Sequence, residues 1–154
     1  MPIEADLIKK IRKLNQRHAY TTIQMHETVA RKAGLNGTDH KYIGFLIERG
    51  PMTAGELASL TGLTTGAITG LVDRLEKKKL VKRHFAENDR RKVIIKPNLD
   101  RIMALLQPLY KEYRKQSEEL IATFSSKEIA VIELYMSGAI EIMTGTIAAL
   151  NKKK

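Results

Sequence analysis

The sequence of 154 residues predicts a mostly α-helical fold that contains one small β-hairpin. Three observations support this fold class. Apolar residues recur at intervals of three and four along most of the chain, which is the spacing of helices with one buried face. Between residues 80 and 96 the interval changes to two, as in short β-strands. Capping motifs and glycines stand where each periodic stretch begins or ends, so they divide the chain into separate elements.

The ends of the first two predicted helices are marked by turn residues. One long amphipathic helix is expected over residues 4–33, and Gly34 with the pair Asn36-Gly37 ends it. A second helix is expected to begin with Thr38 as its N-cap and to end at Gly50-Pro51. Both helices carry apolar residues on one face, so each is expected to pack against the rest of the chain.

Two shorter helices are predicted next. Thr53 and Glu56 form a capping box, in which the hydroxyl and the carboxylate bind backbone amides that the helix leaves without partners. This box begins a helix over residues 54–60. Thr64 then caps a fourth helix that extends to about Lys78, with an apolar stripe on its buried side.

The change of periodicity places a β-hairpin after these helices. Residues 80–85 and 92–96 are short apolar and β-branched runs, and the polar residues 86–91 lie between them as a charged tip. A short helix, a tight turn, a second helix and a hairpin in this order form a winged helix-turn-helix. In such a fold the second helix of the pair enters the major groove of DNA.

Two long helices are predicted to complete the chain. Asn98 or Asp100 caps the first of them, and Pro108 inside it is expected to cause a kink or a break. Ser125 and Glu128 form a second capping box, which begins the last helix. Neither long helix belongs to a minimal winged helix-turn-helix.

The terminal helices bear more apolar surface than one chain can cover, which favours a homodimer. We therefore expect residues 1–35 and 98–154 to form a helical dimerisation region around a DNA-binding winged helix over residues 36–97, as one continuous domain. The residues predicted at the dimer contact are Leu7, Ile11, Leu14, Ile132, Tyr135, Met136, Ile140, Met143 and Ile147.

Charge points to a polyanionic partner. The formal net charge is +10, and residues 53–97 carry ten basic against five acidic side chains. Residues 98–154 carry eight basic and seven acidic side chains, so the excess charge lies mainly in the first two thirds of the chain. A basic middle segment beside a nearly neutral apolar end suggests that the middle binds nucleic acid and the end binds protein.

Composition and spacing exclude several other classes. The chain has no Cys, which excludes disulfides and thiolate zinc sites, and none of its four histidines shows the i, i+4 spacing of a helical metal site. Neither a phosphate-binding glycine loop nor a nucleophile elbow is present, so we expect no catalytic residue, no metal and no cofactor. No run of about 18 apolar residues predicts a membrane span, and the N-terminus lacks a secretion signal, so we expect a cytoplasmic protein.

Four segments resemble the core of the multiple-antibiotic-resistance regulator (MarR) family in order and spacing. They are Gly55-Glu-Leu-Ala58, residues 63–78, Leu80-Val-Lys-Arg83 and Asn88-Asp-Arg-Arg-Lys-Val93. The resemblance implies a homodimeric repressor that binds a pseudo-palindromic operator in double-stranded DNA and responds to a small aromatic or amphipathic ligand. Two other functions are compatible with the basic sequence. One is an architectural protein that coats DNA without sequence choice, and the other is a protein that binds membrane surfaces through its basic first helix.

The candidate DNA contacts fall on the fourth helix and on the hairpin. Small and hydroxyl-bearing residues at the start of that helix allow close approach to bases and phosphates. Thr64 also fits a purely structural role as an N-cap. In the hairpin, the resemblance implies that Asp89 orients Arg91 and that Arg90 or Arg91 enters the minor groove. Arg74 has an alternative partner on the protein, in Asp73 or Glu76. The full candidate set is Thr53, Thr64, Thr65, Gly66, Ala67, Thr69, Arg74, Lys82, Arg83, Asp89, Arg90 and Arg91.

Two positions depart from the pattern of the family. Gly70 stands where members often carry a basic residue, which removes one candidate for reading a guanine. Lys79 stands where the family usually has a turn glycine, at the end of the same helix. No residue of the chain is singled out by its sequence as a ligand contact.

Overall fold

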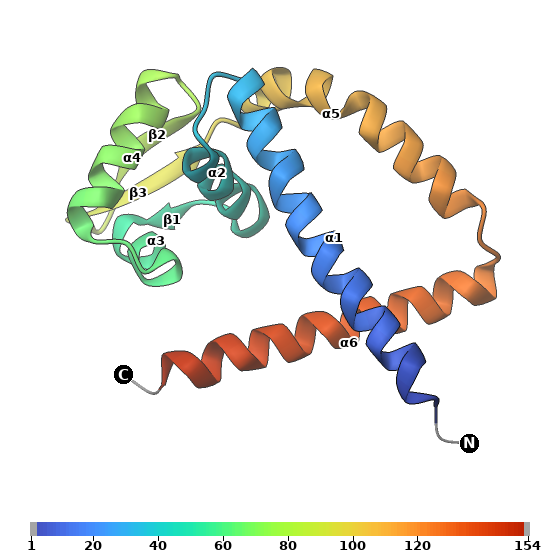
Figure 1. The fold of residues 1–154 in the computed structure, drawn as a ribbon. Coiled ribbons are helices and arrows are strands. Elements are labelled where there is room, and N and C mark those ends of the chain that lie inside the picture. The colour runs from blue at the N-terminus through green and yellow to red at the C-terminus, as the bar shows by residue number, and fades with distance from the viewer. Residues whose placement is uncertain (1–2, 153–154) are drawn as a thin grey trace. The chain divides into compact units, whose positions relative to one another are not determined.

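The computed structural model describes residues 3–152 (Figure 1), so Lys153 and Lys154 of the terminal lysine run lie outside the described chain. Six helices and three strands make up the described part, in agreement with the predicted fold class. They are α1 (Ala5–Lys32), α2 (Gly37–Arg49), β1 (Met52–Thr53), α3 (Ala54–Thr61), α4 (Thr65–Lys77), β2 (Val81–Ala86), β3 (Asp89–Pro97), α5 (Leu99–Ala122) and α6 (Ser126–Asn151).

Most helix ends follow their local sequence signals. Both predicted capping boxes form, at the start of α3 and at the start of α6, and Thr64 caps α4. The predicted cap of α2 is wrong: the side chain of Asn36, not that of Thr38, accepts the amide of Asp39 at 2.7 Å. Asn36 has the extended backbone of an N-cap, and the helix therefore begins at Gly37, earlier than predicted.

The hairpin belongs to a sheet of three strands in the order β1-β3-β2. β2 and β3 pair antiparallel, as the alternating pattern predicts, and β1 pairs with the other edge of β3. The sequence prediction missed β1 because two residues are too short for a period-2 pattern to be recognised. This extra strand joins the start of α3 to the hairpin, so the two elements are held in one body.

A compact apolar core fixes the orientation of α4. Its buried members come from the end of α1, from α2, α3 and α4, from the sheet and from the start of α5, and Figure 1 shows α2, α3, α4 and the sheet gathered in one body (teal to yellow). Burial of large aliphatic side chains contributes about 1.5–3 kcal/mol each, so this core stabilises the body that carries α4. The fully buried members include Ile43, Leu46, Leu57, Ile68, Leu71, Leu75, Leu80, Ile95 and Ile102.

The chain divides into two compact units, one ending at Tyr110 and the other beginning at Lys111. Of the kink or break predicted at Pro108, the break is absent, since α5 continues through this residue. A proline removes one backbone hydrogen bond of a helix, and the neighbouring turns can keep theirs. The second unit holds the end of α5 and all of α6. No residue of α6 is buried within the described chain, although many of its side chains are apolar.

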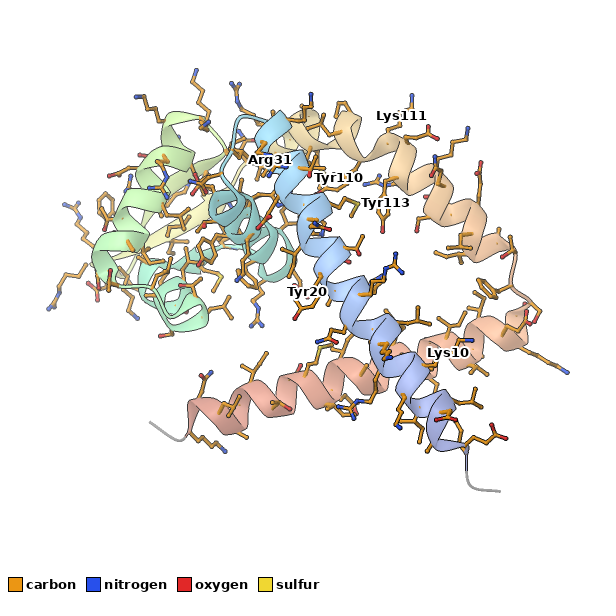
Figure 2. The ribbon with its side chains drawn as sticks, viewed as in Figure 1. Lys10, Tyr20, Arg31, Tyr110, Lys111 and Tyr113 are labelled. Carbon is orange, nitrogen blue, oxygen red and sulfur yellow. The ribbon has the colours of Figure 1, made fainter. Side chains whose placement is uncertain are left out.

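Two histidines and a tyrosine join three helices inside the first unit. Tyr110 of α5 lies against α1 (Figure 2), and its hydroxyl is 2.6 Å from Nδ1 of His26 and 3.1 Å from Nε2 of His40. The two imidazole rings are stacked, with centroids 5.5 Å apart. Burial lowers the pKa of His40, and the nearby His26 lowers it further. The neutral form of His40 therefore suits this joint between α1, α2 and α5.

Candidate nucleic-acid interface

The N-terminal half of α4 presents small polar side chains to solvent. Thr65, Gly66, Ala67 and Thr69 are exposed, whereas Ile68 and the apolar residues that follow it on the same side are buried in the core. Packing on one face thus aims the opposite face outward. Small side chains let the backbone approach a groove closely, and the helix N-terminus attracts phosphate.

The threonines of this region have hydrogen bonds within the protein and spare capacity beyond it. The hydroxyl oxygen of Thr64 accepts the amide of Ala67 at 3.2 Å, so the N-cap role is present. Thr69 donates its hydroxyl to the carbonyl of Thr65 at 3.0 Å, and Thr53 accepts the amide of Glu56 at 3.0 Å in its capping box. A hydroxyl has one donor and two acceptor sites. Thr53 and Thr64 therefore keep a donor for a phosphate or a base edge, whereas Thr69 keeps only acceptor capacity, which suits a donor group on a base edge.

The tip of the hairpin carries a basic bulge. Phe85 pairs with Val93 and Ala86 pairs with Asp89, so the register shifts by three residues on β3 between these two pairs. The residues in the bulge are Arg90, Arg91 and Lys92, all exposed. Bulges redirect side chains away from the sheet, and this one presents three consecutive cations at the end of the hairpin. We call β2, β3 and their turn the wing.

Asp89 and Arg91 have the contact that the resemblance implies. The carboxylate of Asp89 accepts the backbone amide of Arg91 at 3.0 Å, and its oxygen lies 3.6 Å from Nε of the same arginine. The Arg91 side chain is 95% exposed, so its guanidinium is oriented by the carboxylate without being covered. An exposed guanidinium at the tip of a wing suits the narrow negative minor groove of A·T-rich DNA.

Arg74 is directed at the protein. It donates from Nε and Nη2 to the two carboxylate oxygens of Asp39 at 3.2 and 2.9 Å, and this hydrogen bonding raises the pKa of Arg74. Asp39 lies in α2 and its side chain is 3% exposed. The pair therefore ties α2 to α4, and the partner is neither of the two carboxylates, Asp73 and Glu76, that the sequence offered.

Arg83 is also directed at carboxylates of its own chain. Its guanidinium donates to Glu76 at 2.9 Å and to Asp73, and its backbone amide donates to Glu76 at 3.0 Å. The hydrogen bond to Asp73 raises the pKa of Arg83 above its ordinary value. Lys82, the neighbouring candidate, is exposed. Arg83 is thus paired with two carboxylates, whereas Lys82 is exposed to solvent. The DNA contacts predicted for Lys82 and Arg83 stay predictions.

Asp39 and Lys92 are functional candidates that the sequence prediction missed. Asp39 precedes Tyr42 and Ile43 by the helical intervals of three and four, so its place on the buried stripe of α2 was visible as an acid among apolar residues. Lys92 was assigned to a strand, and only the register of the hairpin places it in the bulge.

Known proteins resemble this chain along most of its length. Residues 33–92 match the MarR family. YcgE, an uncharacterized HTH-type transcriptional regulator of Bacillus subtilis, is 36% identical over 150 residues, which cover 97% of this chain and 94% of YcgE.

Two solved structures share the fold. A MarR family protein from Bacillus stearothermophilus has a TM-score of 0.72 at 22% identity, covering 93% of this chain and 99% of the other. The Staphylococcus aureus MepR–DNA complex has a TM-score of 0.57 at 17% identity, covering 84% of this chain and 96% of MepR.

Proposed function

The chain belongs to the MarR family of transcriptional regulators, and we propose that it acts as a homodimer on a pseudo-palindromic DNA operator. Members of this family regulate transcription and are not enzymes, in agreement with the expected lack of a catalytic site. We further propose that the protein is a cytoplasmic repressor that releases DNA when a small molecule binds. The resemblance supports a small aromatic or amphipathic anion as that ligand.

One arrangement carries the proposed DNA contact. The exposed N-terminal face of α4 and the basic bulge of the wing stand on one body, because the shared core and the sheet hold both. We call α4 the recognition helix. The small polar side chains on its exposed face have the size and polarity to read a major groove. The bulge has three cations for the adjacent minor groove or the phosphates beside it.

Selection from a pool of random duplexes tests this proposal. A dimer that places two recognition helices on one face of DNA should select a site with two-fold symmetry and half-sites about one helical turn, roughly 34 Å, apart. Recovery of one half-site without its repeat would contradict a dimer on DNA. Recovery of no common sequence would contradict sequence-specific binding.

The proposed dimer contact is supported by the apolar surface of the terminal helices. Leu7, Ile11 and Leu14 on α1 are about half exposed, and Ile140, Met143 and Ile147 on α6 are more than half exposed. A second copy of the chain would cover these side chains, as homodimer interfaces do. We therefore assign residues 1–35 and 98–154 to dimerisation and residues 36–97 to DNA binding.

A membrane is the other environment that α6 would suit. Within the described chain, α6 alone has the length and composition of a membrane span. However, Glu133 and Glu141 lie in the central part of the helix, and an ionised side chain at the centre of a bilayer costs several kcal/mol. Membership of a family of transcriptional regulators also favours a protein partner for this surface.

The substitution Ile140→Asp tests the dimer. It places a charge in the predicted contact, so we expect sedimentation to show monomer or aggregate where the wild type is a dimer at micromolar concentration. Leu134 is 77% exposed, and its spacing of nine residues, or about two and a half turns, places it across the helix from Met143 of the predicted contact, which makes Leu134→Asp the matched control. A folded monomeric wild type, or equal loss of dimer in both variants, would contradict the assignment.

A further inference from the structure

We infer that Arg83 is a positioning residue, which fixes the wing to the recognition helix so that both elements meet DNA at a set spacing. The inference rests on the proposed function, because it assigns a role inside the same DNA-binding surface. It replaces the phosphate contact that the sequence predicts for this side chain.

The polar contacts of the Arg83 guanidinium lead to α4. Nη1 donates to Glu76 at 2.9 Å, and Nη2 donates to Asp73 and, at 3.4 Å, to the carbonyl of Thr69. β2 is an outer strand, so one of its sides has no neighbouring strand. The backbone amide of Arg83 donates to the second oxygen of Glu76 at 3.0 Å. Side chain and backbone of one residue thus hold the same helix.

The charge of this cluster opposes a phosphate contact. One guanidinium faces two carboxylates, so the three side chains together carry a net negative charge. A phosphate that approached Arg83 would have to displace or approach Asp73 and Glu76, and like charges repel. The paired cation has no surplus charge with which to release counterions from DNA.

Arg91, on the same wing, is an exposed cation and provides the comparison for Arg83. Its side chain is 95% exposed, and its ion pair with Asp89 has one contact of 3.6 Å. The Arg83 side chain is 29% exposed and bridges two carboxylates with a planar fork. The two arginines therefore have separate tasks, with Arg91 directed outward and Arg83 directed at the recognition helix.

Loss of this connection should reduce discrimination more than general attraction to DNA. A wing that is released from α4 keeps its three cations in the bulge, so its sequence-independent attraction to phosphate remains. Operator binding requires the helix and the wing to fit their grooves together, and a wing held by the sheet but no longer by Arg83 has more freedom of movement to lose on binding.

The sign of the effect of Asp73→Asn separates the two roles of Arg83. This substitution removes a negative charge next to DNA, so a phosphate-binding Arg83 would be freed and operator binding would tighten. A positioning Arg83 loses a partner, and we expect affinity for the duplex selected by the wild type to fall about tenfold. Affinity for a scrambled duplex of the same length should stay equal or rise.

A second substitution and a matched control complete the experiment. Arg83→Lys keeps the charge but loses the fork, so it should weaken operator binding without changing the slope of affinity against salt. Combined with Asp73→Asn it should add little further loss, because both act on one connection. Lys82→Gln, on the same strand, should instead reduce the salt slope by about one.

The outcomes distinguish this inference from the proposed function. Tighter operator binding by Asp73→Asn, or a smaller salt slope in Arg83→Lys, would overturn the positioning role alone. If the wild type does not prefer its selected duplex, the proposed function fails, and amide hydrogen exchange still tests the connection. The Arg83 amide should exchange faster in Glu76→Ala than in the wild type, and an unchanged rate would overturn the inference.

Discussion

Removal of Arg74 should destabilise the fold and leave the salt dependence of DNA binding unchanged. Breaking a fully buried ion pair from one side costs about 3–5 kcal/mol, because the remaining charge is left without a partner. Asp39 is buried, but the Arg74 side chain is 50% exposed, so water already screens one end of this pair. We therefore expect Arg74→Ala to lower the free energy of unfolding by about 2–3 kcal/mol.

Urea denaturation followed by circular dichroism measures this loss, at a fixed protomer concentration because the stability of a dimer depends on it. Lys77→Ala, on the exposed side of the same helix, is the matched control and should stay within about 0.5 kcal/mol of the wild type. Adding Asp39→Asn to Arg74→Ala should recover part of the loss, since the unpaired carboxylate is then absent. The reasoning is refuted if Arg74→Ala is as stable as the control and binds DNA with a smaller salt slope, because Arg74 would then be the phosphate contact predicted from sequence.

Three further predictions concern the wing, the end of α4 and the histidine joint. Arg91→Ala should weaken operator binding by about 1–3 kcal/mol and reduce the salt slope, and Asp89→Ala should act in the same direction more mildly. Thr69→Val should instead relax sequence preference, and an affinity within about twofold for both wing variants would contradict the groove contact. Lys79 has φ of 62°, which disfavours a side chain, so Lys79→Gly should stabilise the protein by about 1 kcal/mol in thermal melts; a lower melting temperature would contradict this reason. Folding lowers the pKa of His40, so the unfolded chain binds more protons at acidic pH; stability should be complete above about pH 6.5 and fall as the pH drops through that value. The loss between about pH 7.5 and 5.5 should be smaller in His40→Gln, and an equal loss would show that other groups cause it.

Local signals allowed most elements to be predicted. The capping boxes at Thr53 and Ser125 and the cap at Thr64 each depend on residues within three positions, so the sequence is enough to place them. The start of α2 was misplaced because Asn36 and Thr38 are both good caps, and in the structure Asn36 has the extended backbone of an N-cap. Lys79 shows a local conflict that tertiary structure resolves, since the chain turns there with a left-handed residue although glycine is absent.

Contacts across the fold could not be predicted from spacing. Arg74 lies 35 residues from Asp39, and only the packing of α2 against α4 brings their side chains together. The sequence offered Asp73 and Glu76 as partners of Arg74 because they are near it in the helix, but these carboxylates face β2 and bind Arg83. Arg90 and Arg91, by contrast, could be predicted as residues of the hairpin tip from charge and pattern alone, whereas Lys92 could not, because only the register places it in the bulge.

The ratio of affinities for a selected and a scrambled duplex tests the central claim most directly. A sequence-specific regulator should prefer its selected site by about 10³ or more at physiological salt. The two duplexes should have the same length and composition, so that the number of phosphates contacted is equal. We predict a ratio in that range for the wild-type protein. A ratio near one, with steep salt dependence for both duplexes, would contradict the account and indicate a basic protein that coats DNA without sequence choice.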